Sequence, residues 1–465
     1  MTLRIRRFLY ISFILLFLII SPLVCLYASG YDLNFKNLAL QKTGMLILDS
    51  SPRGAQVTVK SEVNNFNLST IVSKIFLISD KIYTPAKIKK LIPGEYTINI
   101  QTAGYWTWEK KLSIAPGDST FAENIKLFKN DTPVLASQGK INLTIISNNG
   151  NYMLLDRGRD AILLSLSDVN ELWPMVKNNL KTEPAWSTDD KKILVGSNVY
   201  NINDLLLDNN AEPFNNLSDF ISTSSKMIKW GYGNNIYYII NNNGKGRKNN
   251  TELIEVNIDA KSSKTIFTDK IILDYLPSGN RLITIEKSNR NSLLNIYNSN
   301  NFKLTRTINL PAGDYSFKKT FNNYLILSDS NNNIYILDPE ADEQSVLKNK
   351  LENADNLIWV DKEKIVYYND FEIWQFNIST GEKKIITRIS SKITVVYLLP
   401  SQDYIIYATE KNVYAIELDE RDRRNLTKLV EMDEIKFPII NNSGDTLYFY
   451  SKLNQTEGYF RLQIR

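Results

Sequence analysis

Histidine is absent from this chain of 465 residues. Its absence excludes Ser-His-Asp and Cys-His nucleophile systems, and with them HExxH and other histidine zinc sites. The only cysteine is Cys25, so the rest of the chain forms no disulfide and offers no thiolate to a haem or an iron–sulfur cluster. Carboxylate chemistry, Ser-Lys chemistry and carboxylate-bound Ca²⁺ or Mg²⁺ remain. No motif for any of them is present, so we expect no catalytic residue, no metal site and no cofactor.

An excess of one charge is also missing. The chain has 55 Lys and Arg residues against 50 Asp and Glu residues, which gives a net charge of +5. The sequence has no cluster of Lys and Arg residues that would form a binding face for the phosphate backbone of a nucleic acid. We therefore expect no nucleic-acid partner. A hydrophobic content of 43% is ordinary for a globular protein, and the length is sufficient for two or three domains.

A long uncharged run lies near the start of the sequence, from Phe8 to Leu26. As a helix, its 19 residues would span about 28 Å, close to the hydrocarbon thickness of a bilayer. Three arginines precede the run, and positive charge stays on the cytoplasmic side of a membrane. We therefore predict a cytoplasmic N-terminus at 1–7, a transmembrane helix at 8–26 and an extracytoplasmic position for residues 30–465. The predicted location is the cell membrane, with a single pass.

Two alternatives remain for this run. A cleaved signal peptide would export the chain in the same direction, and Ala28-Ser29-Gly30 is the nearest candidate cleavage site. The run is longer than a usual signal-peptide core, which favours a retained anchor. Lipidation of Cys25 is the other alternative, although Val24 before it is a poor residue for that motif.

A compact β pattern follows a spacer at residues 27–43. Its strands alternate apolar and polar residues, and tight turns containing Pro and Gly separate them. We predict a small antiparallel β-sandwich at residues 44–130. The expected strands include Met45–Asp49, Gln56–Lys60, Tyr96–Gln101, Trp106–Ile114 and Thr120–Leu127.

The turns of this region resemble those of the PEGA domain, a small β domain named for a Pro-x-Gly-Ala turn. The resemblance covers residues 44–128 and implies a structural or binding module on bacterial envelopes. It rests on Ser51-Pro52-Arg53-Gly54-Ala55, Thr84-Pro85, Leu91-Ile92-Pro93-Gly94-Glu95-Tyr96 and Gly104-Tyr105.

One segment departs from that family. The family usually has a short hairpin where this chain has Ser61–Ile82. The apolar stretch Ile71–Ile78 within it is expected to form either an extra strand pair or a contact surface.

Residues 131–465 contain a weak internal repeat. A polar turn recurs every 40–45 residues and is followed by an apolar strand, a second turn and another strand. This period, with four short strands per unit, is typical of a β-propeller. We count eight units, whose turns are Ser147–Gly150, Trp186–Asp190, Trp230–Asn234, Leu276–Asn280, Phe321–Asn323, Trp359–Lys362, Leu399–Asp403 and Ile440–Gly444.

The turns of this repeat resemble those of WD40-like and TolB-type propellers of bacterial envelope proteins. The eighth unit reaches Arg465 with only three strands, so Pro133–Gln138 is expected to supply its outer strand and close the ring. A ring of seven blades is one alternative, and a β-solenoid or a pair of β-sandwiches is another.

Two groups of tryptophans have different expected roles. Trp186, Trp230 and Trp359 occur at the same phase of the repeat, which predicts core positions between blades. Trp106 and Trp108 are two residues apart in an expected strand, and so would face one side. Core packing is favoured there too, but an exposed pair would form a binding surface for a sugar or a membrane interface.

The predicted fold class is mainly β: a transmembrane helix, a PEGA-like sandwich and a propeller. The favoured function is a membrane-anchored envelope protein, not an enzyme, that binds or scaffolds envelope proteins or cell-wall glycan. The alternative is a glycan hydrolase that uses two propeller carboxylates on opposite sides of a sugar bond.

Overall fold

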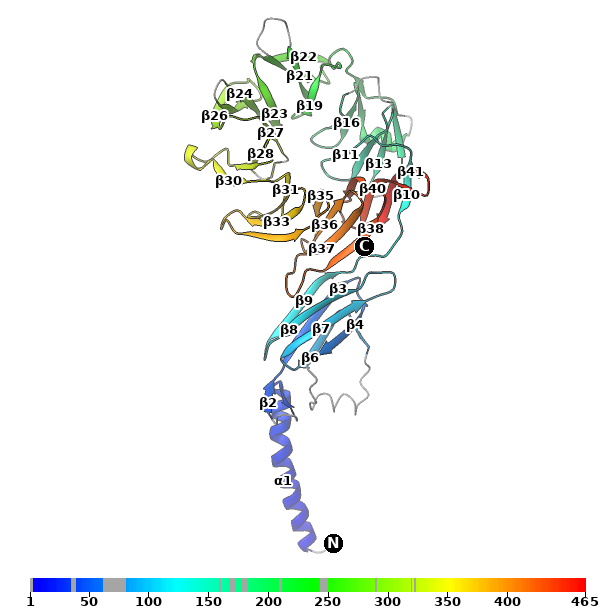
Figure 1. Cartoon of the computed structure of the whole chain (residues 1–465), viewed down its shortest axis with the longest axis vertical. Helices are drawn as coiled ribbons and strands as arrows, with labels where there is room; N and C mark the ends of the chain where they lie inside the picture. The colour runs from blue at the N-terminus through cyan, green and yellow to red at the C-terminus, as the bar shows by residue number, and fades with distance from the viewer. Residues whose placement is uncertain are drawn as a thin grey trace.

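The computed structural model shows one apolar helix, a small β domain and a ring of sheets, in that order along the chain (Figure 1). Most of the predicted insert at Ser61–Ile82, including Ile71–Ile78, lies outside the described residues. The structure describes residues 3–34, 39–61, 81–158, 160–166, 172–176, 182–208, 211–242, 250–288, 291–318, 320–321 and 323–465.

Helix α1 (Leu3–Ala28) contains the predicted apolar run and extends beyond it at both ends. Its segment Arg6–Ala28 is long and apolar enough to cross a membrane, a property that a signal anchor and a signal sequence share. A two-stranded hairpin follows, formed by β1 (Tyr31–Asn34) and β2 (Ala39–Lys42).

The small domain is a β-sandwich of two sheets. One sheet has the order β6-β3-β9, and the other has the order β5-β4-β7-β8. The prediction of an antiparallel sandwich was wrong at one place, because β9 pairs with β3 in parallel. The inward side chains of both sheets form a single core that includes Leu48, Ile98, Leu112 and Ile125. The strands are β3 (Gly44–Ser51), β4 (Gln56–Ser61), β5 (Ile82–Tyr83), β6 (Ala86–Leu91), β7 (Gly94–Gln101), β8 (Trp108–Ile114) and β9 (Ser119–Lys126).

The remaining described strands form eight four-stranded antiparallel sheets, which succeed one another around a ring as the blades of a propeller (Figure 1). In blades 1 to 7 the strands run in sequence order from the centre of the ring outward. Blade 1 contains β11 (Leu143–Ile146), β12 (Tyr152–Asp156), β13 (Asp160–Ser165) and β14 (Leu172–Val176). Blade 2 contains β15 (Ala185–Trp186), β16 (Lys192–Val195), β17 (Asn198–Asn201) and β18 (Asn215–Asn216), with helix α3 (Ile202–Leu207) before β18.

The next blades repeat this order. Blade 3 contains β19 (Lys226–Trp230), β20 (Asn235–Asn242), β21 (Asn250–Asn257) and β22 (Ser262–Lys270). Blade 4 contains β23 (Ile272–Ser278), β24 (Arg281–Lys287), β25 (Ser292–Asn298) and β26 (Leu304–Leu310). Blade 5 contains β27 (Tyr315–Phe317), β28 (Leu325–Asp329), β29 (Ile334–Leu337) and β30 (Leu347–Leu351), with the 3₁₀ helix η1 (Glu343–Ser345) before β30.

Blades 6 and 7 precede the closing blade. Blade 6 contains β31 (Asn356–Trp359), β32 (Lys364–Tyr368), β33 (Glu372–Asn377) and β34 (Lys383–Arg388). Blade 7 contains β35 (Ile393–Leu398), β36 (Tyr404–Thr409), β37 (Asn412–Glu417) and β38 (Leu426–Glu431).

Blade 8 joins two distant parts of the chain. It contains β39 (Lys436–Ile440), β40 (Thr446–Leu453) and β41 (Thr456–Gln463), and its outer strand is β10 (Val134–Gln138). Val134 lies opposite Arg461, and Gln138 lies opposite Gly458. The prediction that Pro133–Gln138 supplies the missing outer strand is confirmed.

Tryptophans at the predicted phase of the repeat connect neighbouring blades. The Nε1 of Trp230 donates to the carbonyl of Ala185 in the preceding blade at 2.8 Å, and Trp186 does the same to Ile145 at 3.4 Å. Trp359 stacks on Phe321, with 4.6 Å between the ring centroids. The expected core role of these three residues is confirmed.

Candidate interaction site at the domain junction

The two tryptophans of the predicted binding surface have different environments. Strand β8 begins at Trp108, so Trp106 precedes the strand, and its amide donates to the carbonyl of Phe128 at 2.8 Å. Trp106 is 39% exposed, whereas Trp108 is only 4% exposed. The indole Nε1 of Trp108 donates to a carboxylate oxygen of Glu417, in blade 7, at 3.3 Å. Trp108 thus joins the two domains and presents no open surface, and only Trp106 remains available to a ligand.

A buried lysine next to Trp108 is the centre of this junction. The side chain of Lys110 is fully buried, and its Nζ lies 2.9 Å from an Oε of Glu417 and 3.3 Å from an Oδ of Asp419. It also donates to the carbonyl oxygen of Asp419 at 2.9 Å. Asn425 donates to the same oxygen of Glu417 at 3.0 Å, and the other oxygen accepts from Trp108. A buried ion pair is tolerated only when its remaining polar atoms are satisfied in this way.

The loop between β37 and β38 supplies further contacts with strand backbones of the sandwich. Asp422 accepts from the amide of Lys111 at 3.0 Å, and Arg421 donates to the carbonyl of Phe121 at 2.8 Å. Arg421 also donates to both carboxylate oxygens of Asp419. Burial alone would raise the pKa of Asp419, but hydrogen bonds from Arg421 and the charges of Lys110 and Arg421 lower it to about 2. The carboxylate of Asp419 therefore stays ionised.

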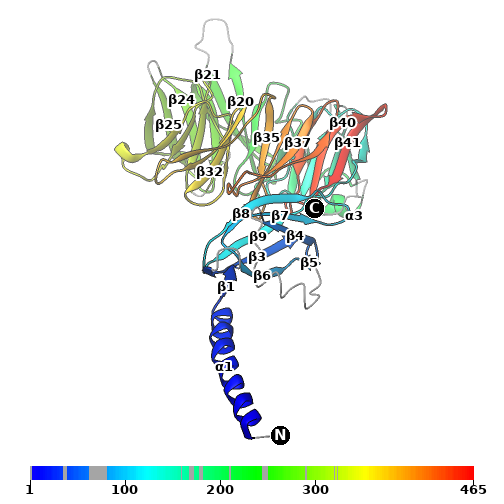
Figure 2. The same ribbon diagram turned by 60° about the horizontal axis from the view of Figure 1, so that its bottom comes forward.

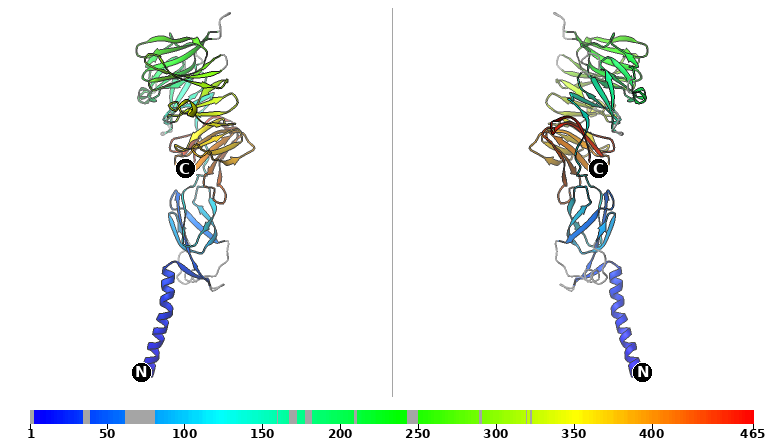
Figure 3. Two further views of the ribbon diagram at one scale, coloured as in Figure 1. Left: turned by 90° about the vertical axis from the view of Figure 1, so that its left-hand side faces the viewer. Right: turned by 90° about the vertical axis from the view of Figure 1, so that its right-hand side faces the viewer.

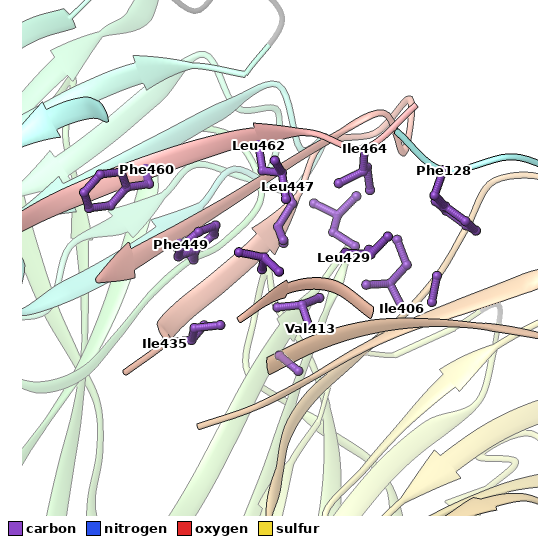
Figure 4. Close-up of a cluster of buried hydrophobic side chains, with 14 of the residues drawn as sticks. Phe128, Ile406, Val413, Leu429, Ile435, Leu447, Phe449, Phe460, Leu462 and Ile464 are labelled. Atoms are coloured by element: carbon purple, nitrogen blue, oxygen red, sulfur yellow. The ribbon is translucent and has the colours of Figure 1, made fainter. Parts of the chain in front are cut away.

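Apolar contacts complete the junction. Phe128, from the segment that leaves the sandwich, packs edge-on against Tyr404 of blade 7 with ring centroids 5.4 Å apart. Figure 4 shows Phe128 at the end of the core shared by blades 7 and 8. Just after it, the amide of Lys129 donates to the carbonyl of Ile464 at 3.0 Å. Polar and apolar contacts together fix the sandwich at one edge of the ring, as the side views show (Figure 3).

A groove of about 700 Å³ opens beside these contacts. The outer edges of β8 and β9 form its walls, and the β37–β38 loop forms one end. Its lining carries both signs of charge, from Glu95, Lys111, Asp118, Arg421 and Asp422.

The hydrolase alternative depends on the carboxylates of the propeller. Burial, and then the charge of Asp370, raise the pKa of Asp355 in blade 6. Asp370 itself pairs with Lys392 at 2.9 Å. Two cavities of about 300 Å³ between blades 4 and 5 each contain a single carboxylate, that of Glu340, which pairs with Arg281 at 2.5 Å. Within the described ranges, no group of three or more acidic, histidine or cysteine side chains is arranged to hold a metal ion.

Sequence reasoning missed Lys110 and Glu417. One signal was present: residues 108, 110, 112 and 114 form the buried face of β8, and Lys110 is the one charged residue on it. A lysine on the buried face of a strand requires an acidic partner. The sequence does not show where in the chain that partner lies.

Comparisons with known proteins establish the fold of the ring. No family model matches the chain. No curated protein matches it either. The C-terminal WD40 domain of Sif2 is 12% identical, with a TM-score of 0.50, over 71% of this chain and 99% of that domain. A eukaryotic initiation factor (11% identity, 72% and 90% of the two chains) gives a TM-score of 0.46. The computationally designed Ika8 protein (10% identity, 70% and 97%) gives 0.45. The chain therefore contains a WD40-like β-propeller.

Proposed function

We propose that this chain is a membrane-anchored bacterial cell-envelope protein that binds or scaffolds other envelope components and is not an enzyme. In this proposal α1 is a retained anchor, with residues 1–7 cytoplasmic and the rest of the chain extracytoplasmic. The sandwich, whose turns resemble the PEGA domain, is the spacer, and the propeller is the recognition domain. WD40-like propellers typically serve as protein-binding scaffolds, and partners here are envelope proteins or cell-wall glycan.

The junction around Lys110 is the observation that carries this proposal. A protein that presents a partner at a fixed place above a membrane needs a stiff connection between anchor and recognition surface. The described contacts of the sandwich involve blades 7 and 8 only. Figure 2 shows the sandwich beneath one side of the ring, so the loops of the other blades are not covered by it.

The two faces of the propeller offer separate test positions. The strands of a blade alternate in direction. The loop between the first and second strands therefore lies on the same face of the ring as the loop between the third and fourth strands, and the loop between the second and third strands lies on the opposite face. Tyr232, between β19 and β20, is 79% exposed and lies on the face that carries the junction loop. Phe371, between β32 and β33, is 47% exposed and lies on the opposite face.

We would place a photo-crosslinking residue at Tyr232 or at Phe371 in the full chain, irradiate intact cells and identify the products by mass spectrometry. Reproducible protein adducts from one position only would support the scaffold and identify its face. A position on the rim, exposed Asn309 on the outer strand β26 of blade 4, serves as the control for random collisions. Recovery of wall glycan with release of shortened sugars by the purified protein would overturn the proposal in favour of the hydrolase.

Topology needs its own measurement. Protease added to intact cells with a permeable outer layer is expected to degrade residues 30–465. Digestion only after lysis would contradict the exported position. The mass of the N-terminal peptide of the mature protein then distinguishes a retained anchor from a cleaved signal.

A further inference from the structure

Strand β6 carries three lysines in four residues at the edge of the sandwich. Lys87 and Lys89 are exposed, while Ile88 between them packs on the core of the domain. Among the described strands β6 pairs with β3 only. The alternation breaks at Lys90, which has a φ of 63° and thus turns its side chain out of the regular strand pattern.

This edge lies beside the outer end of α1. The Nζ of Lys90 is 2.8 Å from the ring centroid of Tyr27, in the last turn of the helix. Leu91, at the end of β6, lies opposite Gly44, and the neighbouring Thr43 amide donates to the carbonyl of Gly30 at 2.8 Å. Figures 1 and 2 both show β6 at the foot of the sandwich, close to the helix.

The β6 lysines differ from many lysines of the propeller in their partners. Within the described part of the chain, no carboxylate lies within ion-pair distance of Lys87, Lys89 or Lys90. In the propeller, by contrast, exposed lysines commonly pair. Such pairs are Lys287–Asp314, Lys350–Glu352, Lys384–Glu420, Lys392–Asp370, Lys428–Glu431 and Lys436–Glu434.

The dimensions of a bilayer place Lys90 and Lys89 at the level of lipid headgroups, with Lys87 just above it. The segment Arg6–Ala28 has 23 residues, about 35 Å of helix, whereas a hydrocarbon core is about 30 Å thick. Each headgroup layer adds about 5–8 Å beyond that core. Ala28 therefore lies near the headgroups. Lys89 and Lys87 precede Lys90 by one and three residues, about 3 and 10 Å along the strand at a rise of about 3.3 Å per residue.

We propose that Lys87, Lys89 and Lys90 form a basic edge that binds the phosphate groups of anionic lipids in the leaflet from which α1 emerges. This inference rests on the proposed anchor. Lysines close to a membrane surface are attracted by anionic headgroups, and the attraction falls off within a Debye length of about 8 Å. The contact would fix the tilt of the sandwich, and with it the propeller, relative to the membrane.

Further charged groups lie in the groove on the β9 side of the sandwich. Glu95 and Asp118 line the groove between β8 and β9, together with Lys111. Strands β6 and β9 are the two outer strands of one sheet, with β3 between them. Asp118, in the turn before β9, is thus separated from β6 by the width of that sheet, whereas Glu95 belongs to β7 in the other sheet.

The test compares amine labelling of the full chain in nanodiscs of phosphatidylcholine and in nanodiscs that also contain phosphatidylglycerol. We expect the anionic lipid to slow labelling of Lys87 and Lys89 about five-fold, and salt at about 0.5 M to restore it. Exposed propeller lysines Lys303 and Lys362 should label equally in both. Equal labelling of Lys87 and Lys89 in both lipids would overturn the inference.

Two further arms separate the alternatives. One outcome is that excess inorganic phosphate protects Lys87 and Lys89 from labelling in phosphatidylcholine nanodiscs. That result would identify the ligand of the basic edge as a free anion and would overturn the proposal that it is a lipid headgroup. The variant Lys87→Glu/Lys89→Glu should lose the lipid-dependent protection of Lys90, and Lys87→Arg/Lys89→Arg should retain it. Recovery of a mature chain without α1 would overturn the proposed function and this inference together, whereas equal labelling in an inserted chain overturns the inference alone.

Discussion

The sandwich uses lysine in opposite ways at its two edges. At the β8 edge, Lys110 is buried and meets the carboxylates of Glu417 and Asp419. At the β6 edge, Lys87 and Lys89 are exposed and lie outside ion-pair distance of any described carboxylate. A buried ammonium that loses its partner is costly, whereas an exposed one keeps its hydration. The first edge is therefore built to hold the fold together, and the second is free to meet something outside it.

Removal of the buried lysine should give the largest effect. Lys110→Met leaves the Glu417 carboxylate buried without its cation, which should cost about 3–5 kcal/mol of unfolding free energy. Hydrogen exchange of the β8 amides, with thermal denaturation, measures the loss. Lys111→Met, at an exposed neighbouring position, is the matched control. Identical β8 exchange in the two variants would show that the ion pair is not the main connection between the domains.

Loss of the indole hydrogen bond should have a smaller effect. Trp108→Phe keeps an aromatic ring in the core but removes the hydrogen bond to Glu417. We expect the free energy of unfolding to fall by about 1–2 kcal/mol. Trp106→Phe should change the unfolding free energy by less than about 0.5 kcal/mol, because that side chain is partly exposed. Denaturant titration of both variants gives the comparison. A larger loss for Trp106→Phe would mean that the junction has been assigned to the wrong tryptophan.

Acid should weaken the β8 edge without a comparable effect on β6. The folded pKa of Asp419, about 2, lies below its ordinary value of 3.8, so its contribution is complete above about pH 4 and is lost as the pH falls toward 2. Protection of the β8 amides relative to their intrinsic exchange rates should therefore fall between pH 5 and 2, and Asp419→Asn should flatten that slope. An unchanged slope in Asp419→Asn would assign the acid sensitivity to another group.

The smallest effect is expected at the basic edge. Lys89→Ala should change the unfolding free energy by less than about 0.5 kcal/mol in detergent, because the side chain is exposed and has no described carboxylate partner. Thermal denaturation of Lys89→Ala and of Lys110→Met under the same conditions compares the two losses of stability. A loss close to that of Lys110→Met would mean that Lys89 stabilises the fold itself, and the two edges would then not differ.

Local sequence signals were sufficient for the repeated part of the molecule. The period of 40–45 residues predicted the blades, and an eighth unit with three strands predicted that Pro133–Gln138 would complete it. These predictions succeed because each blade is built from neighbouring strands. The junction has no such local rule: 309 residues separate Lys110 from Asp419. The alternation of β8 marked Lys110 as buried, but only the folded ring brings its partners to it.

The position of β10 has a mechanical consequence. The sandwich continues into this strand, which completes blade 8 by pairing with β41. A pull between the membrane and a partner held on the ring would thus load the strand on which closure depends. The Lys110 contacts and the bond from Lys129 to Ile464 lie ahead of β10 along the chain. These contacts would carry part of that tension directly into blades 7 and 8, ahead of the strand that closes the ring.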